Sequence, residues 1–140
     1  MGRRTLIASL ALAAGVLAPA SGALALTSFV SPSRNIGCIG DRTEVRCDIK
    51  TSSATPPTRP KKCDLEWGDA FSVSRTGRGH GVCHGDTALP APGQKGVKVV
   101  AYGTSIHLGT ITCTSRTSGL TCHNAGAHGF RLSRQVIRVF

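Results

Sequence analysis

Several signatures of common enzymes and binding modules are missing from this sequence. No two of its six cysteines are separated by only two residues, which argues against a thioredoxin-like redox site and against a zinc knuckle. The sequence also has no Gly-x-Ser-x-Gly motif, the usual trace of a serine hydrolase nucleophile. It therefore carries no local signature of catalysis, and we expect no bound cofactor.

Aromatic and acidic residues are also scarce. The chain has one Trp, one Tyr and four Phe, so we expect a mainly aliphatic core. Proteins that bind single-stranded nucleic acid stack bases on aromatic side chains, and this sequence offers few of them. Seven acidic residues stand against 17 Lys and Arg, which gives a net charge of +10. This balance makes an anionic envelope polymer or surface a candidate partner, but ordinary solubilising charge explains it equally simply, so the partner stays unknown. Nucleic acid is not expected as a partner.

The only long apolar run lies near the N-terminus and indicates a signal peptide. Two arginines precede residues 6–18, which are almost all apolar or small. This run is shorter than the roughly 20 residues that a membrane-spanning helix needs. Ala23 and Ala25 fit the small-x-small rule of signal peptidase, so we predict a signal peptide over residues 1–25. The alternatives are an uncleaved anchor and export by the twin-arginine route instead of the general secretory one.

The predicted mature domain, residues 26–140, contains all the cysteines. Removing 25 of the 140 residues leaves 115, and losing two arginines lowers the net charge from +10 to +8. A chain of this size forms one domain. An even number of cysteines behind a signal peptide implies disulfides and a location that is secreted, periplasmic or in the cell-envelope space. The six residues expected to form disulfides are Cys38, Cys47, Cys63, Cys83, Cys113 and Cys122.

One cysteine spacing occurs twice and predicts two β-hairpins. Cys38 and Cys47 are separated by eight residues, and so are Cys113 and Cys122. If the members of each pair lie opposite one another, their Cα atoms are about 4.5 Å apart, near the lower limit for a disulfide. The hairpin tips then fall at residues 42–43 and 117–118. We predict pairing in sequence order, which leaves Cys63 for Cys83.

The rest of the chain favours strands. Short β-branched stretches bounded by Gly, Ser or Pro predict an all-β, disulfide-stapled sandwich or barrel-like domain, with Pro-rich loops over residues 51–62 and 87–96. One or two helical turns are expected over residues 64–71, and Trp67 is expected to pack over a disulfide in the core. Strands are expected over residues 71–75, 96–101, 106–114, 120–123 and 130–140.

A polar cluster over residues 77–86 raises the question of a metal site. On a helix His80 and His84 would share a face, but the interleaved glycines oppose a helix. On a strand their Cα atoms stand roughly 13 Å apart, too far to share one ion with Asp86 unless the chain turns sharply. We therefore interpret the cluster as a glycine-rich turn stapled by Cys83, and we assign no metal ligands.

Seven blocks follow one another along the predicted mature domain, at residues 31–38, 45–49, 63–68, 82–87, 102–103, 111–124 and 128–134. In this order they resemble a family of small secreted, six-cysteine bacterial proteins of unknown function, mainly actinobacterial. The resemblance covers nearly the whole predicted mature domain. It implies export and a shared fold, and no activity comes with it.

The sequence thus predicts a monomeric or weakly associating domain with a non-enzymatic binding or structural role at the cell envelope or outside the cell. The alternative is a small secreted hydrolase without a local signature. A structure would support that alternative if one histidine met both a serine and an acidic residue. The candidates for that histidine are His80, His84, His107, His123 and His128.

Overall fold

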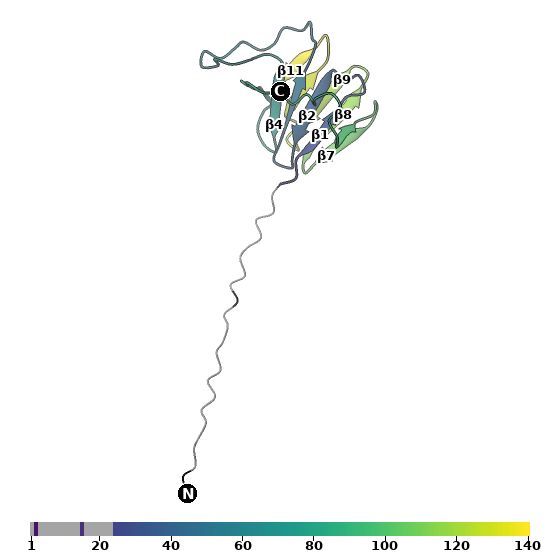
Figure 1. The fold of residues 1–140 in the computed structure, drawn as a ribbon. Helices are drawn as coiled ribbons and strands as arrows, with labels where there is room; N and C mark the ends of the chain where they lie inside the picture. The colour runs from purple at the N-terminus through teal and green to yellow at the C-terminus, as the bar shows by residue number, and fades with distance from the viewer. Residues whose placement is uncertain (1, 3–14, 16–23) are drawn as a thin grey trace.

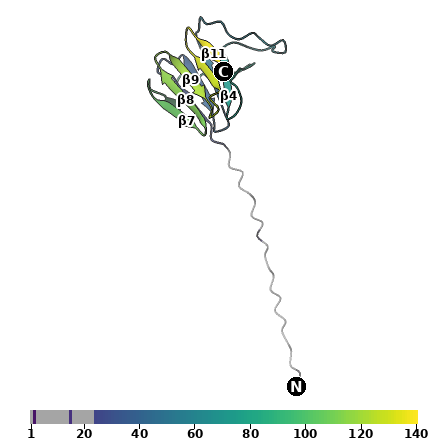
Figure 2. The ribbon, with the colours of Figure 1, turned by 180° about the vertical axis from the view of Figure 1, so that it is seen from behind.

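The computed structural model describes residues 2, 15 and 24–140. Apart from residues 2, 15, 24 and 25, the predicted signal peptide lies outside the described residues. Strands in two sheets, and no helix, make up the regular structure of residues 24–140, as expected for an all-β sandwich. Figures 1 and 2 show the two sheets stacked face to face. The described residues include no helix long and apolar enough to span a membrane.

The first sheet has six strands in the order β5-β4-β3-β2-β1-β6. Neighbouring strands are antiparallel, except that β1 and β6 run parallel. Parallel pairing needs a long crossover, and the chain makes it through β2 to β5. In chain order these strands are β1 (Thr27–Val30), β2 (Ile36–Gly40), β3 (Glu44–Ile49), β4 (Ala70–Ser74), β5 (His80–Gly81) and β6 (Val97–Val99).

The second sheet has five strands in the order β11-β10-β9-β8-β7, and every neighbouring pair is antiparallel. It is a simple meander, because each strand pairs with the next one in the chain. In chain order these strands are β7 (Ser105–Leu108), β8 (Ile111–Arg116), β9 (Gly119–His123), β10 (Gly129–Leu132) and β11 (Ile137–Val139).

The two hairpins predicted from the cysteine spacing are present. Cys38 lies opposite Cys47 in the β2–β3 pair, and Cys113 lies opposite Cys122 in the β8–β9 pair. Both pairs are bonded, with Cα–Cα distances of 4.1 Å and 4.0 Å. The hairpin tips fall at residues 42–43 and 117–118, because the registers place them midway between the paired cysteines.

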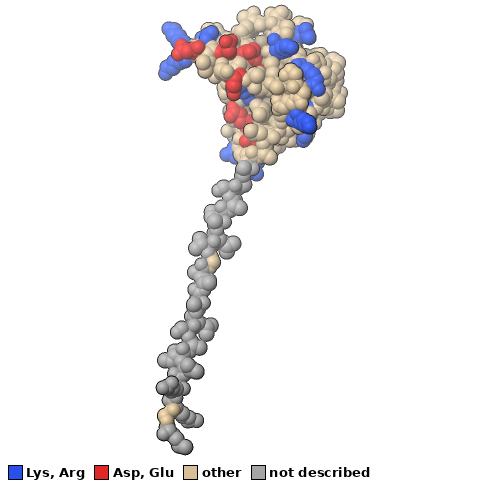
Figure 3. All heavy atoms as spheres, viewed as in Figure 1, with Lys and Arg blue, Asp and Glu red and all other residues tan. Residues whose placement is uncertain are grey.

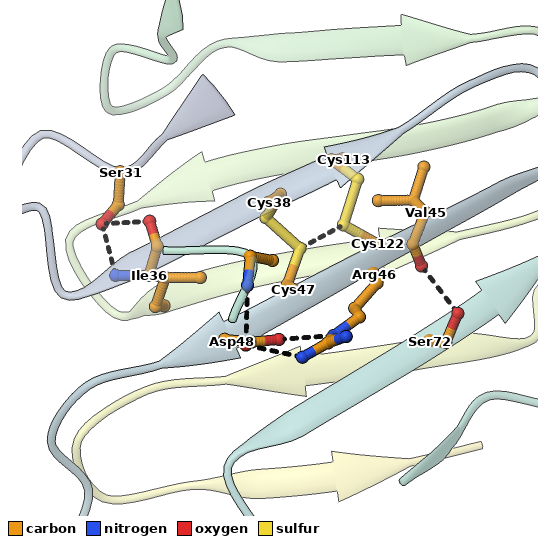
Figure 4. Close-up of a disulfide and its surroundings, with 11 residues drawn as sticks. Ser31, Ile36, Cys38, Val45, Arg46, Cys47, Asp48, Ser72, Cys113 and Cys122 are labelled. Carbon is orange, nitrogen blue, oxygen red and sulfur yellow. Dashed lines mark hydrogen bonds and ion pairs between the residues drawn. A yellow bond between two sulfur atoms is a disulfide. The ribbon is translucent and has the colours of Figure 1, made fainter. Parts of the chain in front are cut away.

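The two hairpin disulfides meet in the centre of the core. Sγ of Cys47 lies 3.8 Å from Sγ of Cys122, so one sheet touches the other through sulfur (Figure 4). Both sulfurs are in disulfides and carry no hydrogen, so this is a van der Waals contact. Around them pack fully buried aromatic and aliphatic side chains, including Phe29, Phe71 and Phe130.

The third disulfide fastens a long connection outside the core. Cys63 is bonded to Cys83, and the segment between β3 and β4 reaches away from the body at the upper left of Figure 1. Trp67 belongs to this segment. Its indole N–H donates to the Pro57 carbonyl oxygen, 2.8 Å away, and a Cβ on Gly81 would fall 2.6 Å from its ring.

Several local expectations were wrong. Trp67 is only half buried and lies outside the core, because its ring covers β5 instead. Residues 64–71 form no helical turn; they contain several bends and one isolated bridge, between Glu66 and His84, before β4 begins. The expected strand over 106–114 is two strands joined at Gly109, and the one over 130–140 is β10 and β11 joined by a turn. The short strands β1 and β5 were not expected.

Candidate binding cleft and an acid-free sheet

Acidic residues are confined to one part of the chain. All seven lie at or before Asp86, in the first sheet and its connections, whereas residues 87–140 contain six Lys and Arg and no acid. In Figure 3 the acidic side chains gather over the left side of the domain, and the right side shows only basic ones. The second sheet, which begins at Ser105, is therefore acid-free.

The first sheet pairs its charges internally. Asp48 on β3 has a side chain only 2% exposed, and Nε of Arg46 lies 2.9 Å from Oδ1 of Asp48. The other carboxylate oxygen of Asp48 accepts hydrogen bonds from the hydroxyl of Thr87 and the backbone N–H of Ala88. Arg46 also pairs with Asp86 at 2.7 Å, and this hydrogen bond lowers the pKa of Asp86. A buried carboxylate with this many donors holds the loop after β5 onto β3.

His84 is a second internally paired group. Its Nε2 lies 2.8 Å from Oδ1 of Asp69, and its Nδ1 contacts the backbone carbonyl oxygen of Asp86. Both partners are acceptors, so only the doubly protonated ring satisfies both. Burial lowers the pKa of His84, but the hydrogen bonds to Asp69 and to the Asp86 carbonyl raise it further, above its ordinary value. The raised pKa favours the protonated ring, which suits a structural role better than that of a general base.

The outer face of the second sheet lacks such pairing. Alternation along the strands places Cys113, Cys122 and Phe130 inward, and their neighbours point outward. On the outer face, Arg131 of β10 lies directly opposite Arg138 of β11. Like charges in opposite positions destabilise a sheet.

Neither arginine forms an ion pair among residues 24–140. Arg131 donates one hydrogen bond to the Ser118 carbonyl oxygen at 3.4 Å, and the Arg138 guanidinium lies 5.6 Å from the centre of the Phe140 ring. Directly opposite residues form a line across the outer face of all five strands, from β7 to β11: Ser105, Thr114, Thr121, Arg131 and Arg138.

A small cleft opens at one end of the sandwich. Its volume is about 220 Å³, and its walls come from three turns, β1–β2, β8–β9 and β10–β11, together with Tyr102. We call it the end cleft. Its polar lining includes Ser33, Tyr102, Arg116, Thr117, Arg134 and Gln135.

Backbone hydrogen bonds hold Tyr102 beside the β8–β9 turn. Thr104 N–H donates to the Ala101 carbonyl oxygen at 3.1 Å, which closes a tight turn with Gly103 at φ 82°. Gly103 suits this position because side chains disfavour positive φ. Gly103 N–H then donates to the Ser115 carbonyl oxygen at 2.7 Å, one residue before Arg116.

The β10–β11 turn is held equally firmly. The hydroxyl of Ser133 accepts from the backbone N–H groups of Gln135 and Val136. The carbonyl oxygen of Arg134 accepts from the N–H of Ser53 at 2.7 Å and from that residue's hydroxyl at 3.0 Å. The backbone under Arg134 is therefore fixed while its side chain stays free.

Gly119 allows the β8–β9 turn to approach β10. A Cβ at this position would fall 2.4 Å from the Leu132 carbonyl oxygen, and the residue has φ 132°. Any other residue here would push apart the two turns that carry Arg116 and Arg134.

Five of the polar side chains in the end cleft have no partner among residues 24–140. Within residues 24–140, the side chains of Arg116, Thr117, Arg134 and Gln135 make no hydrogen bond or ion pair, and neither does the hydroxyl of Tyr102. Two guanidinium groups and three neutral polar groups therefore face solvent together. Such a set can bind an anion that also carries hydroxyls.

The histidines show no arrangement for nucleophilic catalysis. In residues 24–140 no histidine joins a carboxylate to a serine hydroxyl, and no group of three His, Cys, Asp or Glu side chains is placed to hold a metal. His84 and Asp86 meet through a backbone oxygen of Asp86, while His80 lies exposed on β5. His107 contacts Thr112, and His123 contacts the carbonyl of its neighbour.

The sequence reasoning missed the end cleft and the Arg131–Arg138 pair. The signal that was available is the charge distribution, since every acid precedes residue 87. The convergence of the three turns depends on sheet topology, which the sequence does not display.

Fold and site together define a small disulfide-stapled β-sandwich with one acid-free sheet. The chain belongs to DUF6636, a family of unknown function, whose model matches residues 6–140. No curated protein and no solved structure matches the chain.

Proposed function

We propose that this protein is a secreted, non-enzymatic binding domain that attaches to an anionic polymer of the cell envelope. The observation that carries the proposal is the opposition of Arg131 and Arg138 on an outer face without acids. Two cations held in register repel one another, and a bound polyanion would relieve that repulsion. Neither the hydrogen bond from Arg131 to the Ser118 carbonyl oxygen nor the contact of Arg138 with the Phe140 ring neutralises these charges.

Export is part of the proposal. Three disulfides suit an oxidising compartment, and the N-terminal residues carry the pattern of a signal peptide that ends at Ala25. The secreted protein is expected to begin at Leu26. N-terminal sequencing of protein recovered from the medium tests this, and recovery of an intact Met1 to Ala25 segment would contradict it.

The binding proposal is tested by retention on immobilised polyglutamate along a salt gradient. The Debye length falls from about 10 Å at 0.1 M to about 3 Å at 1 M salt, so binding by exposed charges fades over this range. We expect the oxidised protein to be retained at low salt and released well below 1 M. Retention that does not change with salt would contradict an electrostatic mechanism.

A matched pair of variants separates the effect of the outer face of the second sheet from the effect of net charge. The double variant Arg131→Gln with Arg138→Gln and the double variant Lys61→Gln with Lys62→Gln each remove two charges. The lysines are exposed on the connection between β3 and β4, in the part of the chain that contains the acids. We expect early elution of the arginine variant and little change in the lysine variant. Equal shifts would mean that only net charge matters.

A further inference from the structure

The end cleft adds recognition chemistry that the flat face of the second sheet lacks. It combines two unpaired guanidinium groups with neutral hydrogen-bonding groups and one aromatic ring, Tyr102, which is 44% exposed. We infer that the end cleft binds one acidic sugar unit, which makes the polymer an acidic polysaccharide. This inference rests on the proposed function and names the ligand class for the same sheet.

The side chains match the parts of such a unit. A guanidinium group binds a carboxylate through two parallel N–H donors, and Arg116 and Arg134 are both free to do so. Thr117 and Gln135 can each donate and accept hydrogen bonds, as sugar hydroxyls require. Tyr102 offers an apolar ring face beside a polar hydroxyl, which suits the C–H face of a sugar ring. The amides of a peptide polyanion can also bond the neutral groups, but polyglutamate has no sugar ring face to lie against Tyr102.

The size of the end cleft limits what it holds. Complete small-molecule pockets measure about 300–1,000 Å³. The end cleft, at about 220 Å³, is smaller and suits one unit of a chain. The polymer can continue from it over the outer face, because Arg116 follows Thr114 by two residues on the same side of β8. Thr114 belongs to the line that leads to Arg131 and Arg138.

The end cleft is also preorganised. The Tyr102 turn, the Ser133 turn and the Arg134 carbonyl are each held by at least two hydrogen bonds before any ligand arrives. Preorganised groups lose little conformational entropy on binding, so their contacts contribute to affinity and selectivity.

The test compares two polycarboxylates by isothermal titration calorimetry of the oxidised protein at low salt. Polygalacturonate carries its carboxylates on sugar rings, polyglutamate carries them on a peptide, and neutral dextran carries none. We expect polygalacturonate to bind about three- to tenfold more tightly than polyglutamate, and dextran not to bind, because an aromatic contact adds to the shared charge. Tyr102→Ala should remove that preference and leave polyglutamate binding unchanged.

Further variants separate failure of this inference from failure of the proposed function. Arg116→Gln with Arg134→Gln should weaken polygalacturonate binding about tenfold or more, while Lys61→Gln with Lys62→Gln should change it little. Equal binding of the two polymers, or a preference that survives Tyr102→Ala, would overturn the sugar inference and leave the proposed function standing. Binding of neither polymer at low salt would overturn the proposed function as well.

Discussion

The two sheets use charge in different ways. In the first sheet Asp48 is buried and bonded to Arg46, and His84 is bonded to Asp69. In the second sheet, which has no acidic side chain, Arg131 lies opposite Arg138. Buried, paired charges contribute to one folded arrangement, whereas exposed like charges in register weaken it slightly. The first sheet therefore uses charge for structure, and the second presents charge for an external ligand.

The sheets are alike in another respect. Each contains one hairpin with a buried cross-strand disulfide, and the two disulfides touch between the sheets. Removing a hairpin disulfide should therefore lower stability by a similar amount in either sheet. Removing a charged side chain should lower stability in the first sheet only. The following predictions separate these contributions.

The largest effect is expected from removing a hairpin disulfide. Cys38→Ala with Cys47→Ala, and Cys113→Ala with Cys122→Ala, each open a loop with a sequence separation of nine. Each pair should lower the free energy of unfolding by about 3 kcal/mol from loop entropy alone, and further because a buried cavity forms. Guanidinium unfolding measures both. A variant that unfolds at the same midpoint as the unmodified protein would show that its sheet does not need the disulfide.

Removal of the buried carboxylate should come next. Asp48→Ala leaves Arg46 partly buried without its main partner and releases the loop at Ala88, so we expect a loss of about 3–5 kcal/mol. Asp64→Ala, an exposed acid in the same half of the chain, is the control and should change stability by less than about 0.5 kcal/mol. If the two variants unfold alike, Asp48 is not the structural charge described above.

A smaller effect should appear as a pH dependence. Because the folded-state pKa of His84 is raised, the stability from its bonds is fully present below the ordinary value of about 6.5 and is lost as the pH rises through the higher folded value. His84→Asn should flatten the dependence of unfolding free energy on pH across this window. His107→Asn, on the second sheet, should leave it unchanged. A slope that persists in His84→Asn would assign the titration to another group.

The smallest effect on stability, and one of opposite sign, is expected in the second sheet. Arg131→Gln removes the repulsion with Arg138, so the protein should become more stable by a few tenths of a kcal/mol. The same variant should elute earlier from polyglutamate. If the variant is more stable and also binds polyglutamate more weakly, Arg131 contributes to binding and not to folding. A clear loss of stability would show that the hydrogen bond from Arg131 to the Ser118 carbonyl oxygen outweighs the repulsion.

The sequence was informative where geometry restricts it most. Two cysteines with eight residues between them form a cross-strand disulfide only if they lie opposite one another, so this spacing predicted both hairpins and their tips. The short turns that divide two of the expected strands were harder to predict from the sequence. Gly109 divides a β-branched stretch that reads as one strand, and Ser133 begins a turn inside another. Without that second turn, the opposition of Arg131 and Arg138 cannot be predicted.

The candidate site was harder to predict for a related reason. Tyr102, Arg116 and Arg134 are far apart in the sequence and meet only because three turns lie at the same end of the sandwich. Strand order and strand direction decide which turns lie at the same end of the sandwich. No local sequence pattern indicates either of them. Trp67 shows the converse error, because a lone tryptophan four residues after a cysteine suggested the core, but its ring packs against Gly81 of β5 instead.

The central claim is that the acid-free sheet is the binding surface. Amide chemical shifts of the isotope-labelled, oxidised protein, recorded while a short galacturonate oligomer is added at low salt, test it most directly. We expect shifts in the end cleft and along β8 to β11, around Arg116, Arg131 and Arg134, with β3 and β4 unchanged. Shifts confined to the first sheet, or to the segment that carries Lys61 and Lys62, would contradict it.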